Sequence, residues 1–324
     1  MTTTPLHKQV LSRYSSVQAW LELLGNLGRA PATLDAYGRA LAHYLLHCEG
    51  SGLKPESATF EQVTLYIREL LPGAKSAVAN STLHQRLTAI RLWYDHLVFQ
   101  GLCEHNPVPR GQHGRLAQVP GHGGFVRGLL PRLIKLPDIP TDEQWRHFLS
   151  IAARSSIRDR LMLSLAYFGA LRRAELVALR IEDLDVAHRL ISVRAETTKG
   201  KRSRVVCYSP DIAPVLIEHL HALRGAGWMR GSLFRSASDR NRGSPLSRWA
   251  WSKTVEGWAK EAKLSHLSTH TFRHLRLTHL ARAGWKLHEL TTYAGHRDPK
   301  TTLIYLHADS TPFGHSAHAD PDTC

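Results

Sequence analysis

Apolar residues recur at helical spacing through most of the first hundred positions of the chain. Between residues 81 and 100 the apolar side chains lie three or four positions apart, so they would share one face of a helix. Thr59 and Gln62 have the order and spacing of a capping box, which indicates the start of a helix. The pattern predicts helices over residues 16–24, 33–47, 59–71 and 81–100.

This regular pattern stops between residues 103 and 140. The segment has six prolines and six glycines, and its five Lys and Arg residues outnumber its two acids. Because proline and glycine interrupt helices and strands, the composition predicts a basic linker. We therefore expect a helical domain over residues 1–102 and a second domain over 141–308. A polar tail at 309–324 is expected to lack fixed structure on its own.

The second domain combines helical and strand patterns. Thr141 and Gln144 repeat the capping box, and helices are predicted over residues 142–153, 158–168 and 211–224. Two runs rich in valine and isoleucine, 189–195 and 204–208, flank the sequence Lys199-Gly200-Lys201 and predict a β-hairpin with a basic tip. Helical patterns dominate the remainder. The expected fold class is therefore mainly α with a small β element.

The composition favours a globular protein that binds a polyanion. The chain has 324 residues and 43% hydrophobic content, enough for a packed core, and its formal net charge of +15 favours phosphate contacts. No apolar run approaches the roughly 18 residues that span a bilayer, and the N-terminus has no signal-peptide pattern, so we expect a soluble, cytoplasmic protein without a membrane partner. The four scattered cysteines indicate reduced thiols. No nucleotide-binding glycine motif supports an ATP-driven mechanism.

Candidate catalytic side chains lie in the second half of the chain. Tyr305 follows His296 by nine residues, and His270 and Arg273 lie upstream of both, with Arg172 earlier still. A phenol, imidazoles and guanidiniums in a basic chain suggest a nucleophile aimed at a phosphate. Arginine suits the non-bridging oxygens because its planar group donates two parallel bonds without losing its proton. Tyrosine has a pKa of about 10 and needs a base such as histidine, and a lysine can protonate the leaving oxygen.

This ordered set resembles the tyrosine recombinase (phage integrase) family, over about residues 16–307. The resemblance implies that Arg172 is the first catalytic arginine, that Lys199 is the lysine of the hairpin, and that His270 and Arg273 form the HxxR pair. His296 would then be the late histidine and Tyr305 the nucleophile. Glu175 matches an acidic position that supports the site in the family. The other basic residues of the hairpin, Lys201, Arg202 and Arg204, are expected to contact DNA.

The resemblance also implies an architecture and a reaction. An N-terminal helical core-binding domain and a mixed α/β catalytic domain would form a C-shaped clamp around double-stranded DNA. The enzyme would cleave and rejoin DNA through a covalent 3′-phosphotyrosyl intermediate, as a homotetramer on two duplexes, without a metal or other cofactor. Two departures from the family pattern are Ala170, where glycine is usual, and Arg276, where an aromatic residue is common. The second leaves the packing of its helix open.

Several alternatives remain at the level of sequence. Arg173 competes with Arg172 for the phosphate, and the basic neighbours of Lys199 compete for the role of proton donor. His270, His274 and His296 could instead form a zinc site. A topoisomerase of type IB, which nicks and closes one duplex, shares the chemistry, and a DNA-binding protein could share the fold without catalysis. Integration of a mobile element, excision and resolution of chromosome dimers stay equally open.

Four tryptophans of the second domain could either pack in the protein core or stack on DNA bases. Aromatic residues within helical patterns more often fill a core. We therefore expect all four to pack inside the protein: Trp249, Trp251, Trp258 and Trp285.

Overall fold

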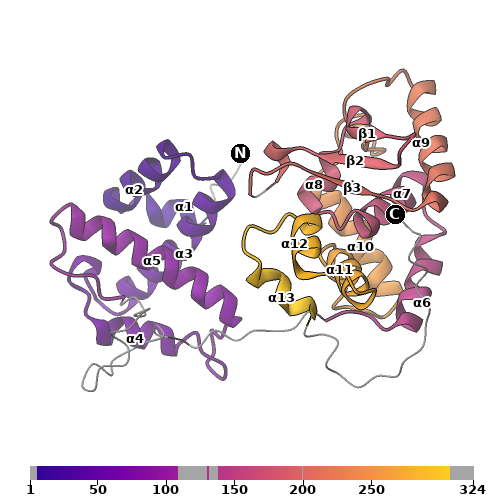
Figure 1. The fold of residues 1–324 in the computed structure, drawn as a ribbon. Coiled ribbons are helices and arrows are strands. Elements are labelled where there is room, and N and C mark those ends of the chain that lie inside the picture. The colour runs from indigo at the N-terminus through magenta and orange to yellow at the C-terminus, as the bar shows by residue number, and fades with distance from the viewer. Residues whose placement is uncertain (1–5, 109–129, 131–137, 199, 307–324) are drawn as a thin grey trace. The chain divides into compact units, whose positions relative to one another are not determined.

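The computed structural model describes residues 6–108, 130, 138–198 and 200–306. The chain divides into two compact units, Met1–Ile134 and Lys135–Cys324, and this boundary lies inside the segment with the composition of a linker (Figure 1). Most of that segment, the C-terminal tail and Lys199 lie outside the described residues. The domain limits inferred from the sequence therefore stay predictions.

The N-terminal unit is helical. Its elements are α1 (Leu6–Leu11), α2 (Ser15–Asn26), α3 (Pro31–Gly50), a 3-10 turn (Pro55–Ser57), α4 (Phe60–Arg68) and α5 (Asn80–Phe99). The capping box at the start of α4 is confirmed, since the Thr59 amide donates to Gln62 at 2.9 Å and the Gln62 amide donates to Thr59. The core includes the buried tyrosines Tyr44 of α3 and Tyr94 of α5, whose hydroxyl oxygens lie 2.8 Å apart. The predicted helices are confirmed, and α1 was not predicted.

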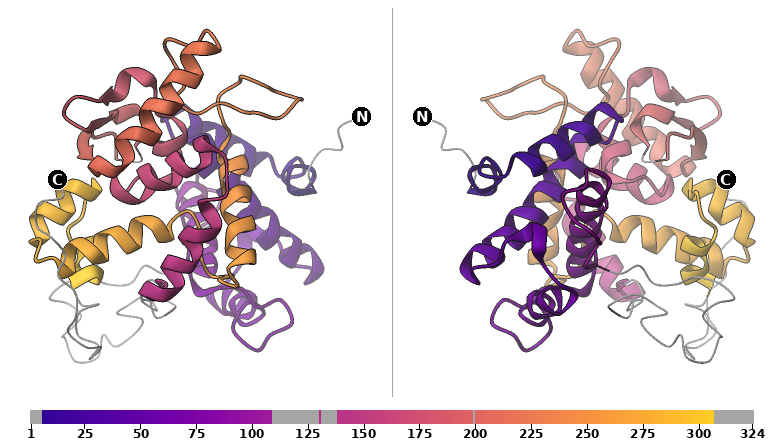
Figure 2. Two further views of the ribbon diagram at one scale, coloured as in Figure 1. Left: turned by 90° about the vertical axis from the view of Figure 1, so that its right-hand side faces the viewer. Right: turned by 90° about the vertical axis from the view of Figure 1, so that its left-hand side faces the viewer.

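The C-terminal unit combines helices with a small sheet, so the expected fold class is confirmed. Its helices are α6 (Asp142–Ala152), α7 (Ile157–Phe168), α8 (Arg173–Val177), α9 (Ala213–Gly225), α10 (Arg248–Glu261), α11 (Thr271–Arg282), α12 (Leu287–Ala294) and α13 (Lys300–Leu306). Its strands are β1 (Leu184–Asp185), β2 (Leu190–Val193) and β3 (Arg204–Cys207). The second capping box, at Thr141 and Gln144, starts α6 as predicted. Figures 1 and 2 show α12 and α13, in yellow, packed side by side.

The sheet is antiparallel in the order β1-β2-β3. Strands β2 and β3 form the predicted hairpin, in a register that pairs Leu190 with Cys207 and Val193 with Arg204. Ile191 and Val206 are buried on the inner face, as an alternating pattern requires. Strand β1 has two residues, too few for a periodic pattern, which explains why it was not predicted.

Three of the four tryptophans pack as expected. Trp251 and Trp258 are buried beside Phe148 and Phe272, and Trp285 lies edge-on to Tyr293. The expectation is wrong for Trp249, which is 70% exposed. Residues two positions apart point to nearly opposite sides of a helix, so burial of Trp251 turns Trp249 toward solvent.

The charged side chain of Arg276 is accommodated in the packing of α11, which the sequence had left open. Its guanidinium lies over the rings of Tyr167 and Phe168 on α7, at 5.6 and 5.3 Å from their centroids. A guanidinium is attracted to the face of an aromatic ring, and its aliphatic stem packs on apolar surface. The packing of α11 against α7 is thereby preserved.

Within the part of the chain that the structure describes, helices long and apolar enough to cross a bilayer do not occur.

Candidate active site

The first arginine of the site lies at the start of α8. The backbone amide of Arg172 donates to one carboxylate oxygen of Glu175 at 2.9 Å, and its guanidinium donates to the other at 2.8 Å. The same guanidinium lies 3.4 Å from the carbonyl oxygen of Gly295. Arg173 is exposed and instead donates to the hydroxyl of Ser252 at 2.6 Å. The local contacts therefore favour Arg172 over Arg173 as the arginine that binds the phosphate.

Glu175 holds a second arginine as well. Arg204 on β3 donates to both carboxylate oxygens, at 2.7 and 3.2 Å. The side chains of Glu175 and Arg204 are 0% and 5% exposed. Burial raises the pKa of the carboxyl, but the hydrogen bonds and charges of Arg204 and Arg172 outweigh it, so the pKa of Glu175 lies below its usual range.

The DNA contact expected of Arg204 stays a prediction, and in this structure the side chain has a protein partner instead. Its guanidinium is turned inward and is bound to a buried carboxylate, because an unpaired carboxylate at that depth would be very costly. Lys201 and Arg202 are exposed in the turn of the hairpin, where the Thr198 hydroxyl accepts a bond from the Arg202 amide at 3.0 Å. Their contact with DNA stays a prediction, and Lys199 is outside the described residues.

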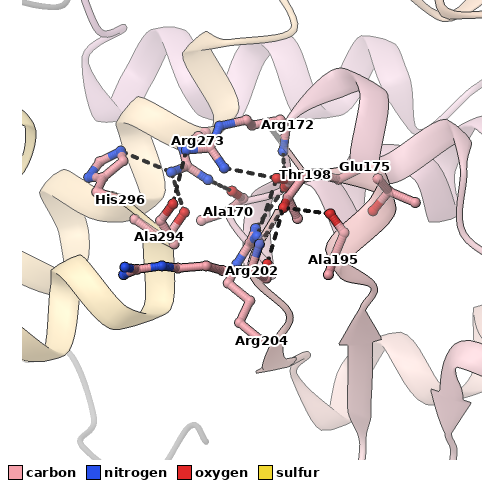
Figure 3. Close-up of polar contacts among 12 residues, drawn as sticks. Ala170, Arg172, Glu175, Ala195, Thr198, Arg202, Arg204, Arg273, Ala294 and His296 are labelled. Atoms are coloured by element: carbon pink, nitrogen blue, oxygen red, sulfur yellow. Dashed lines mark hydrogen bonds and ion pairs between the residues drawn. The ribbon is translucent and has the colours of Figure 1, made fainter. Parts of the chain in front are cut away.

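Arg273 is the most deeply buried cation among the described residues of the site, at 3% exposure. Its two terminal nitrogens donate to the carbonyl oxygens of Ala170 at 2.6 Å and Ala294 at 2.5 Å (Figure 3). These carbonyls follow α7 and end α12, so the two helices fix the guanidinium from two sides. Burial, then the charges of Arg172 and Arg204, lower the pKa of Arg273 to about 9.

Ala170 adopts a backbone conformation that favours glycine, the residue that the resemblance leads us to expect at this position. Its φ of 45° lies in the left-handed region, which an L side chain enters at a cost of roughly 1–2 kcal/mol. This conformation directs the Ala170 carbonyl at Arg273. The strain is therefore part of the geometry that orients the arginine.

A matched pair of glycine substitutions tests this strain. Ala170→Gly should change the free energy of unfolding by less than about 1 kcal/mol, because relief of strain offsets the lost methyl and the greater freedom of the unfolded chain. Ala166→Gly, inside α7 and also buried, lacks that relief and should cost about 2 kcal/mol. Urea unfolding measures both, and equal losses would show that Ala170 is unstrained.

Gly295 positions the late histidine. It ends α12 in the left-handed region, at φ 61°, and an added Cβ would lie 3.2 Å from the Arg204 side chain. The turn brings Nε2 of His296 to 3.0 Å from Arg273 and Nδ1 to 2.8 Å from the hydroxyl of the buried Thr302. Because a guanidinium only donates, Nε2 must accept and Nδ1 carries the hydrogen. Burial and the charges of Arg273 and Arg172 lower the pKa of His296 to about 3.

Tyr305 lies on α13 and is 2% exposed. Its ring is nearly parallel to that of His296, with the centroids 6.4 Å apart. Its hydroxyl oxygen lies 2.7 Å from Nδ1 of His274, one helical turn after His270 on α11. Burial raises the pKa of the phenol, and the charges of Arg273 and Arg172 oppose that shift. The predicted nucleophile therefore lies beside the predicted guanidiniums.

Two histidines near the start of α11 complete the site. His270 immediately precedes the helix, and its ring centroid is 6.2 Å from that of His274. Partial burial, then the charges of Arg273 and Arg173, lower the pKa of His270. His274 was considered only as a zinc ligand at the level of sequence, although its helical spacing from His270 was visible. Among the described residues, no three His, Cys, Asp or Glu side chains are grouped as metal ligands would be.

A tyrosine hydroxyl within the electrostatic reach of two guanidiniums, on a mixed α/β unit, is a set of groups suited to attack on a phosphodiester. The model of the phage integrase family matches residues 140–311, more than half of the chain. The chain therefore belongs to the phage integrase family, the family of tyrosine-type site-specific recombinases.

Relatives and solved structures agree with this assignment. The tyrosine recombinase XerC of Chromohalobacter salexigens is 31% identical, over 91% of this chain and 92% of its own length. XerC of Pelobacter propionicus is 28% identical, over 86% of this chain and 85% of its own length. A lambda integrase dimer bound to a core site has a TM-score of 0.66 at 15% identity, over 95% of this chain and 99% of that one. The structure of the Tn1549 transposon integrase with circular intermediate DNA has a TM-score of 0.65 at 17% identity, over 95% of this chain and 96% of that one. The structural likenesses show a shared fold.

Proposed function

We propose that the protein is a site-specific DNA recombinase that cleaves and rejoins DNA through a 3′-phosphotyrosyl intermediate formed at Tyr305. One observation carries the proposal: the Tyr305 hydroxyl is buried beside His274 and within the electrostatic reach of Arg172 and Arg273. These groups are the nucleophile and the cations that attack on a phosphodiester requires. The family assignment supplies the reaction class.

Each predicted residue has a role in this reaction. Arg172 and Arg273 bind the non-bridging oxygens of the scissile phosphate, and His270 and His296 add hydrogen bonds to it. To donate to a phosphate oxygen, Nε2 of His296 must give up its contact with Arg273 and carry a hydrogen, because in the free protein it accepts from that arginine. The Tyr305 oxygen attacks phosphorus, and Lys199 protonates the leaving 5′ oxygen. The phosphotyrosyl ester keeps the phosphate activated, so rejoining needs no ATP.

Double-stranded DNA is the partner of the proposed reaction. The net charge of +15 supports binding to the phosphate backbone, and Lys201 and Arg202 on the hairpin are expected to contribute phosphate contacts. The structures of similar fold include recombinases described as bound to DNA. Strand exchange between two sites needs four active centres, so we propose a homotetramer on two duplexes.

A paired-site assay tests the proposed function. Target DNA is first selected from a random duplex library by capture of the covalent adduct. Two copies of the selected site are then placed in one plasmid, and recombinant products are separated from relaxed topoisomers. Recombinants that need both sites support the proposal. Relaxation of a one-site plasmid without recombinants would assign a nicking and closing activity of the type IB kind, and DNA binding without any adduct would leave a silent member of the fold.

The hairpin lysine can be distinguished from its basic neighbours. Lys199→Ala should slow cleavage by roughly 10² to 10⁴, since it removes the proton donor for the 5′ oxygen. A substrate with sulfur at that bridging position should recover much of the rate, because a thiolate leaves without a proton. Lys201→Ala should instead weaken binding and reduce its salt dependence by about one unit of slope. Sulfur rescue of Lys201→Ala but not of Lys199→Ala would transfer the role to Lys201.

A further inference from the structure

The hydroxyl of Tyr305 has a partner to which the family motif gives no role. Nδ1 of His274 lies 2.7 Å from the phenolic oxygen, and the two side chains come from α11 and α13. We propose that His274 is the general base of the reaction and takes the proton of Tyr305 as the oxygen attacks phosphorus. This inference rests on the proposed function, since it names the proton acceptor of that same cleavage step.

The geometry places His274 within direct reach of the proton. A general base must lie about 2.6–3.2 Å from the oxygen whose proton it takes, and the observed separation is inside that range. The rings of His274 and Tyr305 have centroids 5.8 Å apart and are tilted by 35°, which leaves the hydroxyl free to meet the nitrogen edge rather than the ring face. Because His274 lies within the regular turns of α11, its position is set by the helix.

The other histidines of the site are less suited to this role. Both ring nitrogens of His296 already have partners, Arg273 and Thr302, and its ring is parallel to that of Tyr305 rather than edge-on. His270 lies one turn before His274, near the guanidiniums, where it can meet the phosphate. His274 is therefore the histidine whose contact with the nucleophile already exists in the free protein.

The charges around His274 keep its nitrogen available. Among the described residues, four groups face it: His270 just before its own helix, Arg273 on that helix, Tyr305 on α13 and His296 after α12. Burial, followed by the charges of His270 and Arg273, lowers the pKa of His274 to about 4, so the ring is neutral at pH 7. Burial raises the pKa of Tyr305, so the phenol keeps its hydrogen. With the hydrogen of the neutral His274 ring assigned to Nε2, Nδ1 accepts from the phenol.

The proposed step balances without any added group. A bond forms between the Tyr305 oxygen and phosphorus, and the bond from phosphorus to the 5′ oxygen breaks. The phenolic proton moves to Nδ1 of His274, and Lys199 supplies a proton to the 5′ oxygen. In the rejoining step the 5′ hydroxyl attacks, Lys199 recovers its proton, and His274 returns the other proton to the departing tyrosine.

Two substitutions at His274 separate proton transfer from simple positioning. Asn can keep an acceptor atom near the place of Nδ1 but cannot take a proton, whereas Ala removes the acceptor altogether. Cleavage is measured in single turnover, with DNA in excess over its dissociation constant, on a nicked suicide substrate that traps the adduct. Both His274→Asn and His274→Ala should lose roughly 10² to 10⁴ in rate, the usual range for removal of a general base. DNA affinity should stay at the wild-type level.

Added imidazole supplies a readout that a structural role would not move. Imidazole can enter the space left in His274→Ala and accept the phenolic proton, so it should raise the cleavage rate. Among substituted imidazoles the rate should increase with their basicity, as proton transfer requires. The wild-type rate should also fall on the acid side, when His274 becomes protonated, and this decline should be missing from His274→Asn.

The chain contains a matched control on the same helix. His279 meets the hydroxyl of Tyr167 through Nδ1 at 2.6 Å, in a similar contact that involves neither Arg172 nor Arg273, although the guanidinium of Arg276 lies over the Tyr167 ring. His279→Asn should lower thermal stability about as much as His274→Asn, yet keep the wild-type cleavage rate and acid decline. If the wild type cleaves DNA and His274→Asn cleaves it at a rate within a few-fold of the wild type, the base role is overturned and the proposed function stands. A slow His274→Ala variant that imidazole fails to accelerate would do the same, and a wild-type protein that forms no adduct would overturn both this role and the proposed function.

Discussion

Tyr305→Phe should form no covalent adduct with DNA while it binds DNA as tightly as the wild type. The substitution removes one hydroxyl and keeps a ring that is 2% exposed and packed against the core of the C-terminal unit. Without the oxygen no phosphotyrosyl ester can form, so cleavage should fall below detection. The loss of the hydrogen bond to His274 should lower the free energy of unfolding by only about 1 kcal/mol. A suicide substrate on a denaturing gel and a binding titration measure the two effects.

Tyr167→Phe is the control for this experiment. It breaks a hydrogen bond to His279 of nearly the same length, in the same half of the chain, without touching the predicted nucleophile. It should cost a similar amount of stability and leave adduct formation intact. Adduct at the wild-type level from Tyr305→Phe would move the nucleophile to another residue, and loss of adduct from both variants would point to a general effect on folding.

Local interactions account for what the sequence predicted well. The capping boxes at Thr59 and Thr141 each join residues three positions apart, so their signal is contained in one turn of chain. The β2–β3 hairpin likewise depends on neighbouring runs with β-branched residues. The exposed Trp249 shows the limit of the same reasoning, because the start of a helix must be known to a residue before its faces can be assigned.

The contacts within the site could not be predicted from spacing. Arg273 and the Ala170 carbonyl are separated by 103 positions, and Arg204 and Glu175 by 29. Such pairs leave no periodic trace in the sequence, since they depend on how whole helices and strands pack. The resemblance identified Tyr305 and the arginines by motif, but it gave no reason to bury Arg204 or to pair Tyr305 with His274. For the same reason the sequence showed Ala170 only as a departure from the family pattern, and its strain followed from the backbone conformation.

Glu175→Gln should destabilise the C-terminal unit by about 3–5 kcal/mol, the usual effect of removing one partner from a buried ion pair. The carboxylate is fully buried and is bonded to the side chains of both Arg172 and Arg204, so its loss leaves two cations close together in a medium that solvates them poorly. For a unit of this size the melting temperature should fall by roughly 10 °C. Cleavage should fall too, because Arg172 loses the contacts that orient it. Glu256→Gln, at an exposed position of α10, should melt close to the wild type.

A double-mutant cycle separates the charge of Arg204 from the other effects of losing Glu175. If the cost comes from an unpaired buried cation, removing that cation with Arg204→Met should restore part of the stability that Glu175→Gln loses. Arg204→Met alone should also be destabilising, because it leaves the carboxylate with Arg172 as its remaining cation. The double variant should therefore be more stable than the sum of the two losses predicts. Additive losses in urea unfolding would show that the two side chains act independently, and would remove the ion pair as the reason for the inward turn of Arg204.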